Sequence, residues 1–230
     1  MDQVVLRIAG VGGDLELLQS AHALNDRAKQ KGRQSTIVTL FAKSILDREN
    51  PRDGGAYIRK CTAEMKRSLP QLSAEGTLYI SGHGCWMSQT MSGWFGDEVA
   101  ELLVTWGGLR RVGKVSVTGC FMGGHGADHA AKLAQAGQST QTFAGSLHKE
   151  LCEKGVITTV FARTETVAVL GEAIVHTNSP LFGRKQIFTT TRNHVETENV
   201  HFSKYAPLGS KIKFEWINGR SVGSTAFPKG

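Results

Sequence analysis

Cysteine is scarce in this sequence, and long apolar runs are absent. The four cysteines, Cys61, Cys85, Cys120 and Cys152, form no CxxC pair, which argues against a disulfide framework and favours reduced thiols. No apolar run approaches the roughly 18 residues needed to cross a bilayer. The N-terminus lacks a basic region followed by an apolar stretch, so we expect no secretory signal peptide and a protein that acts in a cytosol, its own or one reached by another export route.

Low-complexity tracts and internal repeats are also absent, and the composition is that of a folded protein. The chain has 230 residues, of which 40% are hydrophobic, enough for one large domain or for a core domain with an extension. The formal net charge of +7 favours anionic partners such as phosphates or acidic lipid headgroups, although charge alone does not choose among them. Nucleic acid is not the expected partner.

Strand-like and helix-like segments alternate through residues 1–165. Runs rich in β-branched residues predict strands, and apolar residues three and four positions apart predict helices between them. The expected strands are 4–8, 35–41, 77–82, 114–119 and 155–162, and the expected helices are 14–31, 56–69, 97–106, 127–133 and 142–154. This order predicts an α/β three-layer sandwich with a mainly parallel sheet flanked by helices. Residues 42–52 are expected to form an exposed polar loop.

Residues 166–230 have a different character and are expected to form an extension of the core that residues 1–165 build. Segments 166–175, 183–191 and 209–217 show strand-like alternation between polar loops. We therefore predict a basic, strand-rich, antiparallel extension packed on the core rather than an independent domain.

A histidine and a cysteine end two successive strands of the predicted core. Gly82-His83-Gly84 follows one strand, Gly119-Cys120 ends the next, and one helix joins the two. Parallel strands joined by a helical crossover end at the same edge of a sheet, which is the usual ligand-binding edge of an open α/β sheet. We expect His83 and Cys120 to meet at this edge, although a lone buried cysteine is often only a packing residue.

These residue types suit acyl transfer by a thiol nucleophile. A cysteine attacks an amide carbonyl as the thiolate, and a neighbouring imidazole supplies that form. The backbone amides of Gly84 and Cys120 are the expected donors to the oxyanion. Cys120 is thus the candidate nucleophile, and His83 the candidate base and acid.

The two motifs resemble those of the caspase-like cysteine peptidases, a class that includes caspases, metacaspases, clostripain, gingipains and bacterial toxin self-processing domains. The pattern is most similar to that of the toxin domains, with Gly82-His83-Gly84, Ser92-Gly93-Trp94, an acidic helix over Asp97–Leu103, and Gly119-Cys120. Gly119 differs from the acidic residue that usually precedes the metacaspase cysteine. The resemblance implies a cysteine endopeptidase that cleaves its own chain or another protein, and that acts in a host cytosol if it is an effector.

The resemblance also implies activation by inositol hexakisphosphate, which binds a basic surface beside a C-terminal β-flap in the toxin domains. The basic residues of the predicted extension are similar in character, although a solvated basic face explains them equally well. They are Arg184, Lys185, Arg192, Lys204, Lys211, Lys213 and Arg220.

Other residues near the two motifs have competing interpretations. Trp86, Trp94 and Asp97 are candidates for a substrate pocket, but aromatic core packing and capping of the following helix are alternatives. Cys85, two residues after His83, is a second candidate thiol.

Metal and nucleotide sites are less favoured. His125 and His129 lie one helical turn apart, with Asp128 between them, but no further ligand motif accompanies them, so no metal is expected. The glycines of residues 10–13 poorly match a dinucleotide fingerprint, and a tight turn explains them better. Three functions remain: a cysteine endopeptidase, an inactive caspase-like module that binds an anion or a protein, and a nucleotide-binding protein.

Overall fold

The computed structural model describes most of the chain up to residue 164 and four strands beyond it. The described residues are 1–9, 15–47, 55–85, 87–124, 129, 132–133, 135–164, 167–170, 187–190 and 211–225. Among these residues, no helix is both long enough and apolar enough to cross a membrane.

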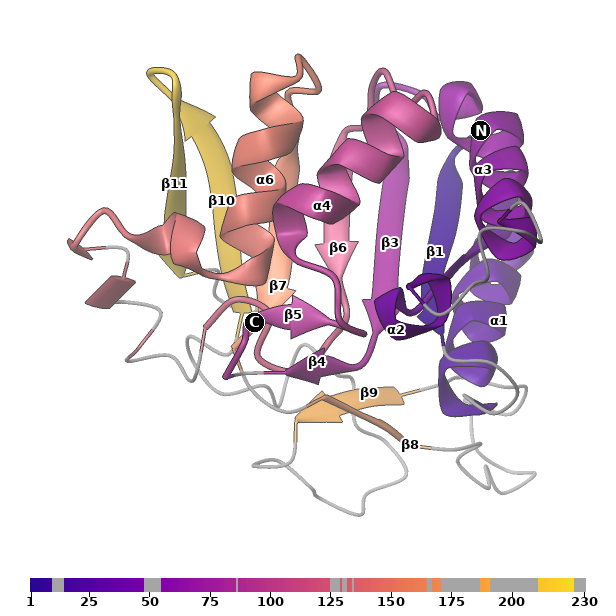
Figure 1. Cartoon of the computed structure of the whole chain (residues 1–230), viewed down its shortest axis with the longest axis horizontal. Helices are drawn as coiled ribbons and strands as arrows, with labels where there is room; N and C mark the ends of the chain where they lie inside the picture. Colours follow the sequence, from indigo (N-terminus) through magenta and orange to yellow (C-terminus); the bar gives the residue numbers. More distant parts are fainter. Residues whose placement is uncertain are drawn as a thin grey trace.

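A mostly parallel sheet of seven strands forms the centre of the molecule (Figure 1). Its strand order is β11-β10-β7-β6-β3-β1-β2; the last five strands in this order are parallel, whereas β10 is antiparallel to both β7 and β11. The strands are β1 (Gln3–Ala9), β2 (Ser35–Phe41), β3 (Thr77–Gly82), β6 (Lys114–Val117), β7 (Thr159–Arg163), β10 (Lys211–Ile217) and β11 (Arg220–Thr225). The predicted α/β class, with its mainly parallel sheet flanked by helices, is confirmed, and a C-terminal antiparallel hairpin continues the same sheet.

Helices cover both faces of this sheet. The helix α1 (Leu15–Gln30) packs on one face, where Ala21 and Leu24 contact Val5. The opposite face carries α3 (Ala56–Ser68), α4 (Gly96–Glu101) and α6 (Phe143–Glu153), and Figure 1 shows α4 and α6 side by side in front of the strands. Alternating β1 residues divide between the two layers, because successive side chains of a strand point to opposite faces.

Three local predictions differ from the structure. The expected loop at 42–52 begins with a one-turn helix, α2 (Lys43–Leu46). An ion pair between Lys43 and Glu98 holds this helix against α4. The helix expected over 97–106 continues beyond Glu101 as a π-turn, Leu102–Trp106. The strand expected from residue 155 starts only at Thr159, because the preceding residues close α6: Val156 N–H donates to Leu151 O at 2.9 Å, and Gly155 is left-handed. β11 was not predicted.

Two small hairpins lie beyond the carboxyl ends of the parallel strands (Figure 1). One pairs β4 (Gly84–Cys85) with β5 (Thr90–Met91), and the other pairs β8 (Val167–Leu170) with β9 (Ile187–Thr190). Strands were predicted in 166–175 and 183–191, where β8 and β9 are found.

Gly96→Ala is expected to lower the free energy of unfolding by about 1–3 kcal/mol. A Cβ at Gly96 would lie 2.0 Å from Phe143 O and 2.6 Å from Leu147 N, where α4 packs on α6. Urea denaturation measures the change, and Lys66→Ala, on the exposed side of α3, is the control, with a change below about 0.5 kcal/mol. Equal stability of the two variants would contradict this close helix contact.

Candidate active site

The pairing of β3 with β6 sets the relative positions of His83 and Cys120. Ile80 is the register partner of Val117, and the backbone N–H and hydroxyl of Thr118 both donate to Ile80 O, at 2.8 and 3.1 Å. His83 and Cys120 each lie three residues beyond this register pair. The parallel strands therefore deliver both residues to the same level of the carboxyl edge, as the crossover predicts.

The turn that contains His83 and the turn that contains Cys120 are in direct contact at Gly84. A Cβ added to Gly84 would lie 2.1 Å from Cys120 O and 2.9 Å from Cys120 N. These are backbone atoms, which cannot move aside as a flexible side chain does. The glycine after His83 thus allows its turn to rest on the backbone of Cys120.

Met91 fills the space beneath these turns. Its side chain is fully buried and occupies the positions that side chains at Gly82 and Gly119 would need: Cβ atoms there would lie 2.7 and 2.6 Å from Met91 atoms. The glycines that flank the two motifs therefore have a packing role, since a larger residue at either position would displace this methionine.

Ser92 fixes the backbone of His83 from both sides. His83 N–H donates to Ser92 Oγ at 3.3 Å, and Ser92 N–H donates to His83 O at 2.7 Å. The hydroxyl of Ser92 in turn donates to Ile8 O, at the end of β1, at 3.1 Å. The imidazole of His83 is exposed, so a solvent-accessible ring stands on a backbone that is tied to the sheet.

The turn after Cys120 is also held tightly. Phe121 has a φ of +56°, a left-handed conformation that costs a non-glycine residue about 1–3 kcal/mol. Gly123 N–H donates to Arg163 O at 2.8 Å, and Ala144 N–H donates to Met122 O at 2.9 Å. These contacts with β7 and α6 hold the strained turn, and Cys120 itself is half-buried.

Of the other three cysteines, only Cys85 is exposed. Hydrogen bonds from the Ser88 hydroxyl, and then from the Ser88 and Met87 amides, lower the pKa of its thiol. Alternation along β4 directs its side chain away from the side on which Gly84 meets Cys120. Cys61 and Cys152 are buried, and burial raises the pKa of both, as expected of cysteines that only pack in the core.

Two of the three predicted pocket residues, Trp94 and Asp97, lie away from His83 and Cys120. Trp94 donates its indole N–H to Phe41 O at 2.9 Å and lines a pocket to which neither His83 nor Cys120 contributes. Asp97 is exposed on α4 and lines a neighbouring depression. It does not cap the helix, since Glu98 accepts the Phe95 N–H at 2.9 Å. Trp86 lies outside the described residues.

Part of the predicted anion surface lies in the described residues. Two basic residues that the sequence analysis did not select, Lys114 and Arg163, lie beside its member Lys211. Lys211 on β10 pairs with Arg163 on β7, and the ammonium groups of Lys211 and Lys114 lie 4.6 and 4.9 Å from the ring centroid of Phe161. Lys213 pairs with Glu215 at 2.5 Å. Arg220 begins β11 as the register partner of Ile217, at the opposite end of β10 from Lys211, so the structure separates it from the other described members. Four predicted members lie outside the described residues: Arg184, Lys185, Arg192 and Lys204.

Burial strongly affects this basic cluster of Lys114, Arg163 and Lys211. It lowers the pKa of Lys211 to about 8, with smaller contributions from the charges of Arg163 and Lys114, and it lowers the pKa of Arg163 to about 10. The pKa of Lys114 is also lowered by burial. Mutual repulsion at a partly buried site favours a bound anion.

The other candidate ligand sites are only partly described. His129 is exposed, while His125, Asp128 and the glycines of residues 10–13 lie outside the described residues. Within the described part of the chain, no three histidine, cysteine or acidic side chains are grouped as a metal site.

Comparison with known proteins assigns no family to the chain. The sequence matches no protein-family model, and no curated protein matches it. A function is therefore inferred from the contacts around His83 and Cys120 and from the motif resemblance.

Gly84→Ala is expected to destabilise the chain by about 1–3 kcal/mol, because the new methyl group meets the backbone of Cys120. Cys85→Ala is the matched control one residue later, at an exposed position, with an expected change below about 0.5 kcal/mol. Urea denaturation of both variants measures the difference. If Gly84→Ala were as stable as Cys85→Ala, the two turns would not be in contact.

Proposed function

We propose that this protein is a caspase-like cysteine endopeptidase in which Cys120 is the nucleophile and His83 the general base and acid. The observation that carries the proposal is the packing of Gly84 on the Cys120 backbone beyond register-paired positions of β3 and β6. It is further supported by solvent access, because His83 is exposed and Cys120 only half-buried.

The reaction follows from these positions. His83 takes the thiol proton, and the Cys120 sulfur attacks the peptide carbonyl carbon to form a tetrahedral intermediate. The amides of Gly84 and Cys120 then stabilise the oxyanion, at about 3 kcal/mol for each donor. The intermediate collapses to a thioester as His83 protonates the leaving amine. His83 next removes a proton from water, which attacks the thioester and releases the acid and the thiol.

The resemblance further supports a self-processing or effector role, with the protein's own chain or a partner protein as substrate. An inactive caspase-like module that binds an anion or a protein is the alternative. The two differ in one property: a peptidase needs a Cys120 that reacts only when His83 is present, whereas a binding module does not.

We also propose inositol hexakisphosphate as an activator, bound at the basic cluster together with Lys213. The specific support is the grouping of Lys211 with its register partner Arg163 and with Lys114, whose ammonium group lies beside the same Phe161 ring. Burial, and to a smaller extent repulsion by Arg163 and Lys114, lowers the pKa of Lys211 to about 8, and a polyanion would relieve that repulsion. The cluster is joined to the cysteine turn through β7, because Arg163 belongs to the cluster and its carbonyl accepts the Gly123 N–H. Binding at the cluster would stabilise this conformation of the turn by shifting an existing equilibrium.

Cys120→Ala is expected to abolish peptide cleavage, because no other thiol is placed against the His83 turn, while Cys85→Ala keeps most of the activity. A thiol-reactive peptide probe should label Cys120 in the wild type but not in His83→Ala; His129→Ala, at another exposed histidine, is the control and should label normally. Cleavage and mass-spectrometric mapping of the label measure these effects. Undiminished cleavage by Cys120→Ala would remove the assignment, and cleavage lost only in Cys85→Ala would transfer it to Cys85.

Inositol hexakisphosphate is expected to raise the melting temperature of the wild type and to raise that of Lys211→Met by less. Below about pH 8, Lys211 is protonated in the folded chain, and its charge lowers the free energy of unfolding. This destabilisation disappears as the pH rises from about 8, the pKa of Lys211 in the folded chain, to 10.5, the ordinary pKa of a lysine. The ligand-free Lys211→Met variant should therefore be more stable than the wild type near pH 7, with a difference that shrinks as the pH rises through this window. Thermal unfolding at several pH values measures both effects. An equal ligand-induced shift in the two proteins would exclude the cluster as the site.

A further inference from the structure

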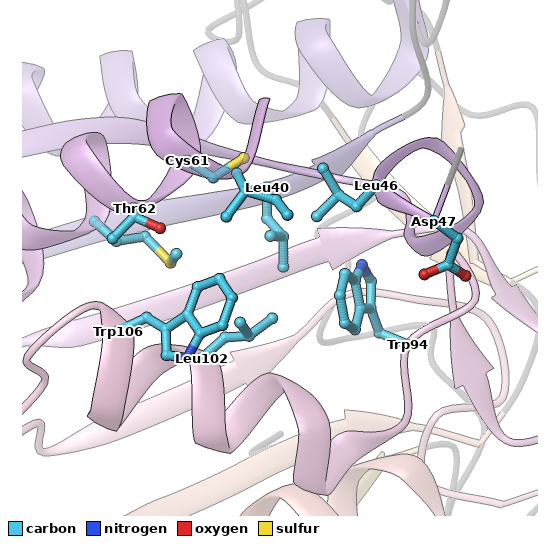
Figure 2. Close-up of a pocket in the computed structure, with 10 residues that line it drawn as sticks. Leu40, Leu46, Asp47, Cys61, Thr62, Trp94, Leu102 and Trp106 are labelled. Carbon is cyan, nitrogen blue, oxygen red and sulfur yellow. The ribbon is translucent and has the colours of Figure 1, made fainter. Parts of the chain in front are cut away.

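An apolar pocket on the helical face of the sheet has no role in the proposed reaction. It has a volume of about 130 Å³, well below the roughly 300 Å³ at which small-molecule and cofactor sites begin. Figure 2 shows the indole rings of Trp94 and Trp106 at its two ends, with Leu102 between them and Leu40 on the other side. A cavity of this size and lining suits a single apolar side chain.

The two tryptophans also line a second, more open depression of about 340 Å³ beside the first. Its remaining residues are mostly acidic. They are Asp97, Glu98, Glu101, Leu102 and Glu150. The apolar pocket and the acidic depression are therefore adjacent, with Trp94, Leu102 and Trp106 in the walls of both. We refer to the two together as the groove.

The charge of this groove is opposite to that of the whole chain. Lys43 pairs with Glu98, and Lys154 pairs with Glu101 at 2.5 Å and with Glu150 at 3.2 Å. Two lysines thus face the four carboxylates of the depression, while the chain as a whole has a net charge of +7. The surplus of negative charge favours a cationic group on the bound partner.

The tryptophans add a second preference for a cation. Lys43 Nζ already lies 5.5 Å from the ring centroid of Trp94, and Trp106 is 39% exposed beside the acidic residues. An indole face next to carboxylates attracts ammonium and guanidinium groups, and a half-exposed tryptophan at a pocket rim is typical of a binding hot spot.

We propose that this groove docks a segment of another protein that carries a leucine- or methionine-sized side chain followed by lysine or arginine. The apolar side chain enters the pocket between Trp94 and Trp106, and the basic side chain lies over Trp106 against Asp97 and Glu101. The proposal does not depend on peptidase activity, since neither His83 nor Cys120 lines the groove.

The test uses four blocked 12-residue peptides with a common Gly/Ser background and a central Leu-Lys-Arg, Ala-Lys-Arg, Leu-Gln-Gln or Ala-Gln-Gln. Nuclear magnetic resonance of the ¹⁵N-labelled full chain follows the indole N–H signals, which are assigned with Trp94→Phe and Trp106→Phe. The Leu-Lys-Arg peptide should shift the Trp94 and Trp106 signals saturably and leave that of Trp216, on β10, unchanged. The other three peptides should bind at least about tenfold more weakly, a difference of about 1.4 kcal/mol.

Asp97→Lys should weaken binding of the Leu-Lys-Arg peptide by about tenfold or more, and its exposed position makes the variant tolerable to the fold. Glu75→Lys makes the same charge change at another exposed site and should leave binding unchanged. The proposal is overturned if no indole signal moves at millimolar peptide, if the Leu-Gln-Gln peptide binds equally well, or if the two lysine variants behave alike. Indole shifts that depend on protein concentration without any peptide would also overturn it, because they would identify a second copy of the chain as the occupant.

Discussion

The hydrogen bonds from Thr118 to Ile80 O fix the register of β3 against β6, on which the relative positions of His83 and Cys120 depend. Because β3 and β6 are parallel and paired at Ile80 and Val117, equal extensions of three residues bring His83 and Cys120 to one edge. Reaction between two side chains requires this common level, and no local property of either motif supplies it. The remaining features of the site preserve that alignment: Ser92 ties His83 to the end of β1, and β7 and α6 hold the turn after Cys120.

Glycine allows the two turns to approach, and a methionine supports them. Gly84 leaves room for the backbone of Cys120, whereas Gly82 and Gly119 leave room for Met91 below. The cysteine turn also packs against the C-terminal part of the chain. A Cβ at Gly123 would lie 2.3 Å from Ile212 on β10, and Arg163, whose carbonyl holds Gly123, faces Lys211 across the β7–β10 pair. The β10–β11 hairpin therefore lies next to the cysteine turn, which contacts both β7 and β10.

Local patterns in the sequence were sufficient for the layers of the fold and for the two strand-end residues. The β-branched run of β2 predicted that strand with the bounds found in the structure, and the apolar spacing of α3 predicted that helix. Both signals come from residues that are close together in the chain. The basic cluster was predicted only in part: Lys114 and Arg163 join Lys211 through the order and register of β6, β7 and β10, which a single sequence does not reveal. Trp94 was linked to His83 because the two are close in the chain, yet its indole turns towards Phe41 O and a pocket between helices. α2 likewise depends on a distant partner, Glu98.

The most direct test of the central claim is a crystal structure of the Cys85→Ala protein after reaction with a blocked dipeptide chloromethyl ketone. We predict a single adduct on the sulfur of Cys120, an imidazole of His83 within about 4 Å of it, and the inhibitor oxygen facing the amides of Gly84 and Cys120. A His83 ring on the far side of the Cys120 turn, or an inhibitor attached elsewhere with Cys120 unreacted, would contradict the account.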